Sequence, residues 1–348
     1  MTKRKKILFW ILVIVTPFML LEMGLRLVGY TWQFPYQDHP DLGYQLKPHY
    51  SGFGADLLDA NKRVPIQTNG LGLRGPQPKT PKPPGLNRIA ALGDACTFGI
   101  GLAYGQTYPA LSEKMLNDVA RANLRFEIIN AGIPGYTSYQ ALALLKQTIL
   151  PLQPDLLIVY FGWNDHAPAD RQIPDQENMA QMRGYILKKM AHLQNNPLRQ
   201  LRIYQGLTSI LLGLQDRARQ GTAIPGEKPL VYRVGLREFK MNLIKIVTLA
   251  KQHKIPTILI TAPYAHSAKT PQKNWQHEIQ THQTYNQATR EAAQASGAIL
   301  LDMARFFRET NPESLLASDG MQPNAAGQRI LAQELVKTIK SIRMTQRR

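Results

Sequence analysis

Short, continuously apolar segments alternate with longer amphipathic segments after residue 88. The apolar segments cover residues 89–92, 126–131, 156–161, 257–261 and 298–301, and the amphipathic segments cover residues 108–121, 137–149, 236–253, 276–296 and 324–342. Strands that are hydrophobic throughout, rather than at every second position, are typical of a parallel sheet buried between two layers of helices. We therefore predict that residues 89–348 form an α/β domain, with a five-stranded parallel sheet in a three-layer α/β/α arrangement.

The N-terminal segment follows a different pattern, which is that of a membrane-spanning helix. Residues 7–21 carry no charge and follow four cationic residues at positions 3–6. The segment 7–29 is long enough to cross a hydrocarbon core of about 30 Å, and a membrane helix tolerates a proline such as Pro17. A cleaved signal peptide is the alternative, but no small-residue cleavage site follows the apolar run. We favour a retained transmembrane anchor, with residues 1–6 in the cytoplasm and the remainder of the chain across the membrane.

Two further segments depart from the alternation. Residues 30–88 are rich in loops, and prolines crowd their end, so we expect an extended stalk or a wrap that leads into the domain. Residues 168–234 form an insert whose apolar residues recur at helical spacing: Leu201, Tyr204, Leu207, Ile210, Leu211 and Leu214. A helix packed on the edge of the domain is the simpler interpretation of this insert. A lid, or a docking face for a partner helix or a membrane surface, is the alternative.

Composition restricts the kinds of partner and site. The 348 residues include 42 Lys and Arg and 24 Asp and Glu, a net charge of +18, of which positions 3–6 carry four charges and the remainder +14. Such an excess indicates an acidic partner, such as an envelope glycan or an anionic lipid. Nucleic acid is not expected, because the basic residues are scattered without interleaved aromatic ones. The single cysteine excludes an intrachain disulfide and a cysteine metal cluster. No His, Asp or Glu spacing indicates another metal site, and we expect no cofactor.

Four polar motifs follow the predicted strands, at the end of the sheet where ligands bind in folds of this type. They are residues 93–99 (GDACTFG), 130–132 (NAG), 162–165 (GWND) and 318–327 (SDGMQPNAAG). In this order and on these strand ends, the motifs resemble those of the SGNH (GDSL-type) hydrolase family. The resemblance begins at residues 68–75 (TNGLGLRG) and runs to the end of the chain. The third motif, extended to GWNDH, and the N-terminal anchor resemble bacterial members in particular. The resemblance implies the flavodoxin-like SGNH fold.

The resemblance also assigns roles to individual positions. In the family, a serine of the first motif is the nucleophile, a histidine of the last motif is the base, and an aspartate orients that base. The matching positions here are Ala95, Gln322 and Asp319, and the family's two oxyanion donors match Gly132 and Asn164. An alanine has no atom that can attack a carbonyl, and a glutamine amide does not titrate near neutral pH. Both reactive members of the triad are therefore missing.

Several of the retained residues have a structural interpretation. We expect Asp94 to cap backbone amides of its own turn, and we expect Gly93 and Gly132 to allow close packing at the strand ends. Asp319 has two interpretations: it binds a ligand, or it accepts a hydrogen bond from the amide of Gln322.

Three other residues are candidates to replace the missing pair. Cys96 is an intrinsically strong nucleophile beside Ala95, but neighbouring side chains on a tight turn diverge, so we expect it to face the core. His166 follows the third motif and His266 follows the fourth predicted strand, and either is a candidate for a displaced base.

Two functions from different classes are consistent with these observations. The one we favour is a catalytically inactive SGNH-like protein, anchored in the bacterial inner membrane by a single span, with its main domain in the periplasm. It would serve as a binding or structural subunit of a cell-envelope or membrane assembly, and its partner would be a protein or an acidic envelope glycan or lipid. The alternative is an active esterase or acyl-transfer enzyme that acts on ester bonds of envelope carbohydrate or lipid through a non-standard nucleophile.

Overall fold

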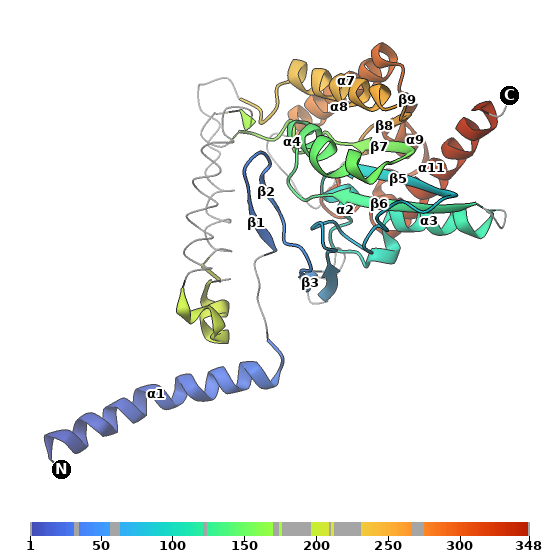
Figure 1. Cartoon of the computed structure of the whole chain (residues 1–348). Helices are drawn as coiled ribbons and strands as arrows, with labels where there is room; N and C mark the ends of the chain where they lie inside the picture. The colour runs from blue at the N-terminus through green and yellow to red at the C-terminus, as the bar shows by residue number, and fades with distance from the viewer. Residues whose placement is uncertain are drawn as a thin grey trace. The chain divides into compact units, whose positions relative to one another are not determined.

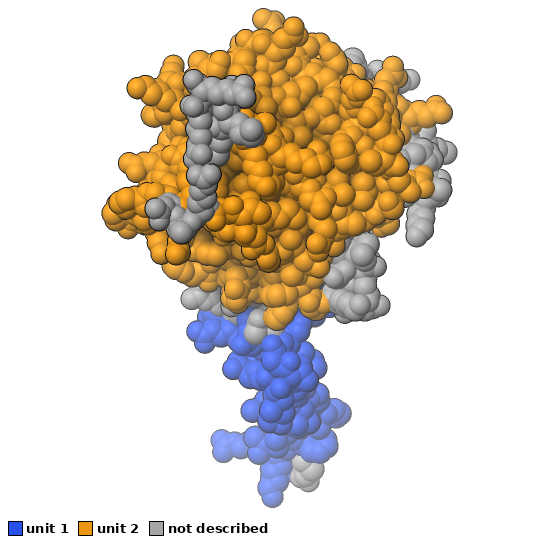
Figure 2. All heavy atoms as spheres, turned by 90° about the vertical axis from the view of Figure 1, so that its right-hand side faces the viewer, with its two compact units in different colours: residues 1–38, 184–229 blue, residues 39–183, 230–348 orange. Residues whose placement is uncertain are grey.

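The computed structural model of the chain describes residues 2–30, 35–55, 63–120, 124–169, 174–175, 196–208, 210–211, 231–265 and 275–346. The chain divides into two compact units, which Figure 2 colours separately. Unit 1 comprises residues 1–38 and 184–229, and unit 2 comprises residues 39–183 and 230–348.

Unit 2 contains a five-stranded parallel sheet, as the sequence predicts. Its strands are β5 (Leu86–Gly93), β6 (Arg125–Gly132), β7 (Leu156–Tyr160), β8 (Thr257–Ile260) and β9 (Ile299–Leu301), in the order β6-β5-β7-β8-β9. The chain therefore extends the sheet first on one side of β5 and then on the other. Ligands of such sheets bind outside the carboxyl ends of the strands, where the direction of winding reverses. In this chain that place lies beyond Gly93, which is in register with both Gly132 and Tyr160.

Helices cover both faces of the sheet, which confirms the predicted three-layer arrangement (Figure 1). One layer contains α3 (Tyr108–Asp118), α9 (Met303–Thr310) and α11 (Ala325–Gln346), and the other contains α4 (Ser138–Leu144), α7 (Leu236–Gln252) and α8 (Trp275–Ser296). Short helices complete the unit: α2 (Ala95–Phe98), η1 (Tyr104–Gln106), η3 (Leu150–Leu152) and α10 (Pro312–Leu315).

The burial along β5 explains why a continuous apolar run forms this strand. Ile89 and Ala91 belong to one hydrophobic cluster with Leu331 and Leu335 of α11. Ala90 and Leu92 alternate with them and have no exposed surface. Because successive side chains of a strand point to opposite faces, both faces of β5 are covered, and neither can carry polar residues.

One predicted helix differs from its expected form. The sequence predicts a single helix over residues 137–149, but the α-helix ends at Leu144 and continues as a π-helical turn, Leu145–Ile149. Pro151, two residues after this turn, cannot donate a backbone hydrogen bond, so a regular α-helical ladder cannot extend through it.

The segment before the large sheet contains short strands that pair with one another. They are β1 (Tyr36–His39) with β2 (Gly43–Leu46), and β3 (Ser51–Ala55) with β4 (Arg63–Gln67). This segment also contacts the helix layer of α4, because Gln140 donates a hydrogen bond to Leu42 O over 3.0 Å. The predicted domain boundaries at residues 30, 88 and 168–234 stay predictions.

Unit 1 contains the long N-terminal helix and part of the insert. Helix α1 (Lys3–Leu27) has no buried residue and is long and apolar enough to cross a membrane, by length and composition. In the insert, η5 (Pro197–Gln200) is followed by helical residues 202–208 and 210–211. Part of the helix predicted from Leu201 onward is thus present, and Leu214 lies outside the described residues.

Candidate functional site

The first motif forms a tight turn at the carboxyl end of β5. Ala95 is the first residue of α2, and Asp94 precedes it as the N-cap, with Oδ1 accepting a hydrogen bond from the backbone N–H of Cys96 over 2.9 Å. This is the capping role that the sequence predicts for Asp94, and it satisfies an amide that the helix itself leaves unpaired. The turn therefore places the methyl group of Ala95 at the position that the resemblance assigns to a nucleophile.

The glycines of the first two motifs are required by close backbone contacts, as predicted. A Cβ added to Gly132 would lie 2.2 Å from the backbone nitrogen of Phe98. A Cβ added to Gly93 would lie 2.9 Å from the backbone oxygen of Tyr160 and 1.9 Å from Oγ1 of Thr97. Only a residue without a Cβ allows α2 to pack this closely on the ends of β5 and β6.

Gly132 and Asn164, which the resemblance assigns as oxyanion donors, already donate hydrogen bonds to acceptors within the protein. The side-chain nitrogen of Asn164 donates to Oδ2 of Asp94 over 3.2 Å and to the backbone oxygen of Tyr136 over 3.0 Å. The backbone N–H of Gly132 donates to Oδ1 of Asn130 over 3.0 Å. An amide nitrogen carries two hydrogens and a backbone nitrogen carries one, so these bonds use every hydrogen of both donors.

Two buried carboxyl groups lie at this end of the sheet. Burial raises the pKa of Asp94 to about 6, against the lowering effect of its hydrogen bond with Cys96. Burial also raises the pKa of Asp165 to about 7, against its hydrogen bond from the backbone N–H of Ser138, which is 2.9 Å long. The second oxygen of Asp165 has no hydrogen-bond partner among the described residues. Removal from water penalises the charged form of each group.

The last motif forms a turn around Asp319. Its Oδ1 accepts hydrogen bonds from the backbone N–H groups of Met321, over 2.9 Å, and Gln322, over 3.0 Å. The predicted bond between Asp319 and Gln322 is thus present, but the backbone donates it rather than the side-chain amide. In the part of the chain that the structure describes, Oε1 of Gln322 is buried without a hydrogen-bond partner.

Cys96 lies in the core, as predicted. Its side chain belongs to the hydrophobic cluster between the sheet and α11, and its sulfur lies 4.0 Å from the backbone oxygen of Met321. That contact brings the first and last motifs together. Burial raises the pKa of the thiol well above its usual value, and the nearby carboxyls of Asp94 and Asp319 raise it further. Because the thiolate is the nucleophilic form, burial and these carboxyls disfavour attack by Cys96.

His166 forms a pair with a histidine that the sequence analysis did not single out, His282 of α8. Nε2 of His166 lies 2.8 Å from Nδ1 of His282, and Nε2 of His282 lies 2.9 Å from the backbone oxygen of Ala262. A carbonyl oxygen only accepts, so Nε2 of neutral His282 carries the hydrogen and Nδ1 accepts from His166. Trp163 stacks on His282 with ring centroids 3.7 Å apart.

The environment of this pair keeps both imidazoles neutral. Burial lowers the pKa of His166 to about 4. Burial and the neighbouring His166 lower the pKa of His282 to about 3. His166 therefore has one ring nitrogen engaged and a pKa far below neutrality, which is unsuitable for a general base at neutral pH. His266, the other predicted substitute, lies outside the described residues.

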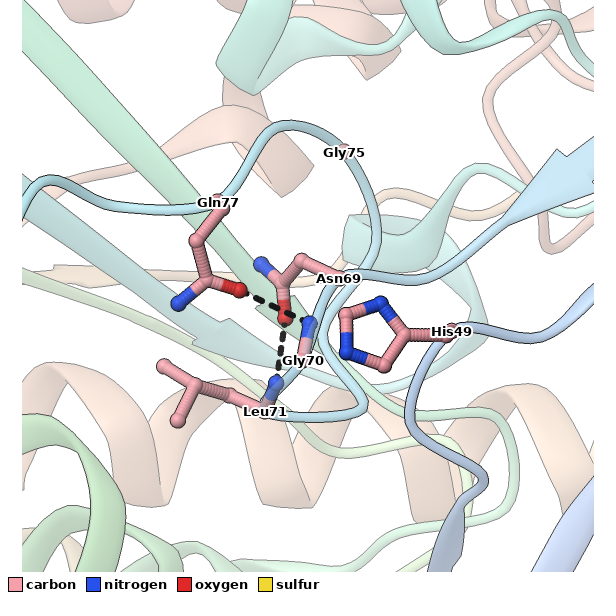
Figure 3. A pocket seen from close by; sticks show the side chains of 6 residues that line it. All are labelled: His49, Asn69, Gly70, Leu71, Gly75 and Gln77. Carbon is pink, nitrogen blue, oxygen red and sulfur yellow. Dashed lines mark hydrogen bonds between the residues drawn. The ribbon is translucent and has the colours of Figure 1, made fainter.

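The motif at residues 68–75 holds the turn after β5 rather than adding a reactive group. The buried guanidinium of Arg74 donates to the backbone oxygens of Phe98 over 2.5 Å and Gly99 over 2.6 Å. Beside it, a hollow of about 410 Å³ is lined by six residues (Figure 3): His49, Asn69, Gly70, Leu71, Gly75 and Gln77. Two of the polar side chains in that view accept hydrogen bonds from backbone nitrogens of residues 68–75: Gln77 from Gly70, and Asn69 from Leu71. These bonds stabilise the backbone of residues 68–75 itself.

Three residues that organise the site were missed by the sequence reasoning. Asn130 is the first residue of the second motif, two positions before its glycine, and Gln328 directly follows the last motif, so their places in or beside the motifs were available signals. Gln328 of α11 joins this helix to α2 and α3. Its side-chain nitrogen donates to the backbone oxygen of Cys96 over 2.9 Å, and its side-chain oxygen accepts from the backbone N–H of Tyr108 over 2.7 Å. His282 had no such signal.

Among the described residues, no group of three His, Cys, Asp or Glu side chains could hold a metal ion.

The chain is similar to a known protein family and to several solved structures. The model of the GDSL-like lipase/acylhydrolase family matches residues 91–330. A lipase/acylhydrolase from Enterococcus faecalis has a similar structure, with 17% identity over 73% of this chain and 96% of that one and a TM-score of 0.47. An acetylxylan esterase from Geobacillus stearothermophilus is similar at 18% identity, over 72% of this chain and 93% of that one, with a TM-score of 0.45. No protein with a curated function matches the sequence.

Proposed function

The chain belongs to the GDSL-like lipase/acylhydrolase family, and from this membership we propose that it is a membrane-anchored, exported member that does not hydrolyse esters. Its main domain would serve as a binding or structural subunit of a cell-envelope assembly. The observation that carries the proposal is the pair Ala95 and Gln322, which occupy the positions of the family's nucleophile and base. With neither an attacking atom nor a proton acceptor, the acyl-enzyme intermediate cannot form at this position.

The hydrogen bonds of the oxyanion-donor positions support the same conclusion. An oxyanion hole accelerates acyl transfer only when its donors point to the developing charge. Here the hydrogens of Asn164 bond to Asp94 and Tyr136, and the N–H of Gly132 bonds to Asn130. The residues therefore serve the fold at the carboxyl end of the sheet, a role that needs no catalysis.

The replacement residues do not favour an active enzyme. A thiol mechanism requires a partly exposed thiolate, whereas Cys96 is 3% exposed and its pKa is raised by burial. A displaced-base mechanism requires a titratable imidazole, whereas burial lowers the pKa of His166 to about 4. These environments support a protein whose site is retained for binding or for structure.

The N-terminal segment and the charge support our proposal for the location and the partner. Helix α1 has the length and composition of a membrane span, and the cations at positions 3–6 favour a cytoplasmic N-terminus. We therefore place the chain in the inner membrane of a bacterium, with the remainder in the periplasm. The net charge of +14 on the residues after position 6 suits an acidic glycan, an anionic lipid or an acidic protein as partner.

Two measurements test the proposal. A fluorophosphonate probe, which reacts covalently with activated serines, should leave the full-length chain unlabelled in detergent. Saturable labelling, abolished by prior heating, would contradict the absence of a catalytic serine.

The assembly role predicts a particle larger than the chain and its detergent when the protein is extracted mildly from its own membrane. A particle of the mass of one chain would contradict that role.

A further inference from the structure

The described part of the insert in unit 1 exposes several large apolar side chains. Five large apolar side chains between residues 198 and 211 are exposed, with exposed fractions from 39% to 60%: Leu198, Leu201, Leu207, Ile210 and Leu211. Single exposed leucines are common on soluble proteins, whereas several large apolar side chains exposed within one short segment are typical of an interaction surface. The helical residues 202–208 and 210–211 carry three of them.

Helix α1 contacts the start of this helical segment through two charged residues. A carboxylate oxygen of Glu22 accepts a hydrogen bond from the backbone N–H of Ile203 over 3.0 Å. Arg26 donates to the backbone oxygen of Gln200 over 3.1 Å, and its Nε lies 2.7 Å from the other oxygen of Glu22. The first amides of a helix lack partners within it, so Glu22 acts as a cap supplied by another helix.

This contact sets the level of the segment relative to a membrane. Glu22 is the first charged residue after the uncharged run 7–21, and it lies in the outer third of the span predicted at residues 7–29. A charged side chain at that position lies at the border between hydrocarbon and head groups. The amino end of the segment at residue 202 is therefore held at the same border.

The groove between α1 and the insert has a lining that suits the acyl chain of a lipid. It has a volume of about 540 Å³, and its lining is mostly apolar: Phe18, Met19 and Met23 from α1, with Leu198, Leu201, Ile203, Tyr204 and Leu207 from the insert. Glu22 and Arg26 are the charged residues of the lining. The groove thus continues the uncovered surface of α1, none of whose residues is buried.

We propose that residues 197–208, together with Ile210 and Leu211, form a second membrane-contacting element, which lies in the bilayer interface at the outer end of α1. Leu207, Ile210 and Leu211 face the acyl chains, and the acyl chain of a bilayer lipid fills the groove. Helices with an apolar face lie in this way at the boundary between head groups and acyl chains. The inference rests on the proposed membrane anchoring of α1, and it is independent of catalytic activity.

The test uses nitroxide labels on the full-length chain in vesicles of phosphatidylcholine and phosphatidylglycerol. The only native cysteine is removed by Cys96→Ala, and single cysteines are introduced by Leu207→Cys, Ile210→Cys and Leu211→Cys. Ile14→Cys in α1 is the bilayer control, and Thr248→Cys on the exposed side of α7 is the water control. Collision rates with oxygen, which partitions into lipid, are compared with those of a water-soluble nickel chelate.

The proposal expects the three insert labels to resemble Ile14→Cys, with oxygen collisions several-fold more frequent than nickel collisions. If they resemble Thr248→Cys while Ile14→Cys stays in lipid, the inference is overturned and the anchor stands. If Ile14→Cys is also accessible to nickel, the anchoring itself is wrong and the inference falls with it. If the three labels are shielded from both reagents, a protein occupies this face and the lipid contact is refuted.

Discussion

The side-chain amide of Asn164 donates a hydrogen bond to the buried carboxyl of Asp94 over 3.2 Å. The same nitrogen donates to the backbone oxygen of Tyr136 over 3.0 Å. These bonds join the loop after β7 to the turn after β5 and to the loop after β6, at the end of the sheet where family members perform their chemistry. Asn164 therefore ties three loops together, and its removal should affect stability.

Replacing Asn164 by alanine should destabilise the fold. Asp94 and the carbonyl of Tyr136 would each lose a donor, and an unsatisfied buried acceptor costs about 1–3 kcal/mol. Urea denaturation of Asn164→Ala should show a free energy of unfolding lower by about that amount. The control is Tyr139→Phe, at a partly buried position on α4 that takes no part in the hydrogen bonds of Asn164. An unchanged free energy of unfolding for Asn164→Ala would show that the amide is not structural.

Two carboxyls and two imidazoles should give opposite pH dependences of stability. The pKa of Asp94 is raised to about 6 and that of Asp165 to about 7, so their contribution is present at low pH and is lost as pH rises through those values. The pKa of His166 is lowered to about 4 and that of His282 to about 3. The contribution of the imidazoles is present above about pH 6.5 and is lost as pH falls.

Variants separate these opposing contributions. Relative to the native chain, Asp165→Asn should gain free energy of unfolding as the pH rises from 4.5 to 7.5, by about 1.4 kcal/mol per unit of the removed pKa shift. His282→Gln should show the opposite trend and gain relative stability as the pH falls. Urea denaturation at several pH values measures both. Parallel curves for native and variant chains would mean that neither group has a shifted pKa.

The thiol of Cys96 should be inert in the folded protein. It is buried beside Asp94, and its pKa is raised, so iodoacetamide should alkylate it only when the chain unfolds. Mass spectrometry should therefore show labelling in urea and none under native conditions within the same time. Rapid native labelling would identify a thiolate and would revive the thiol mechanism.

Gly132 and Gly105 should respond very differently to the same substitution. A Cβ at Gly132 would lie 2.2 Å from the backbone nitrogen of Phe98, whereas a Cβ at Gly105 would meet nothing within 4 Å. Overpacking against backbone should cost Gly132→Ala about 3 kcal/mol or more, and Gly105→Ala should leave thermal stability close to native. Equal melting temperatures for the two variants would contradict the close approach of α2 to β6.

The fold was predictable because its signals are local. Each strand of the large sheet is a short apolar run, and the helices between them carry regular amphipathic patterns, so their positions could be read from neighbouring residues. The π-helical turn Leu145–Ile149 was not predictable from that pattern, since an α-helix and a π-helical turn share the same apolar positions here.

The sequence assigns residues to the site by their places in the motifs, and that assignment stays a prediction; the interactions of these residues could not be predicted from the motifs. Ala95 and Gln322 could be recognised from their places in the motifs. The pairing of His166 with His282 joins residues 116 positions apart, and no motif marks the middle of α8. That Asn164 bonds to Asp94, and Gly132 to Asn130, depends on side-chain directions that only the folded chain defines.

The most direct test of the account is the hydrolysis of a small activated acetate ester by the full-length chain in detergent. The comparison variant, Ala95→Ser with Gln322→His, restores a nucleophile and a base beside Asp319. We predict that the native chain and Cys96→Ala stay at the rate of the blank, and that the double variant gains only a small rate above them, because the hydrogens of Asn164 and Gly132 are bonded within the protein. Turnover by the native chain above that rate, lost on heating and reduced in Asp319→Asn, would contradict the proposal that this protein does not hydrolyse esters.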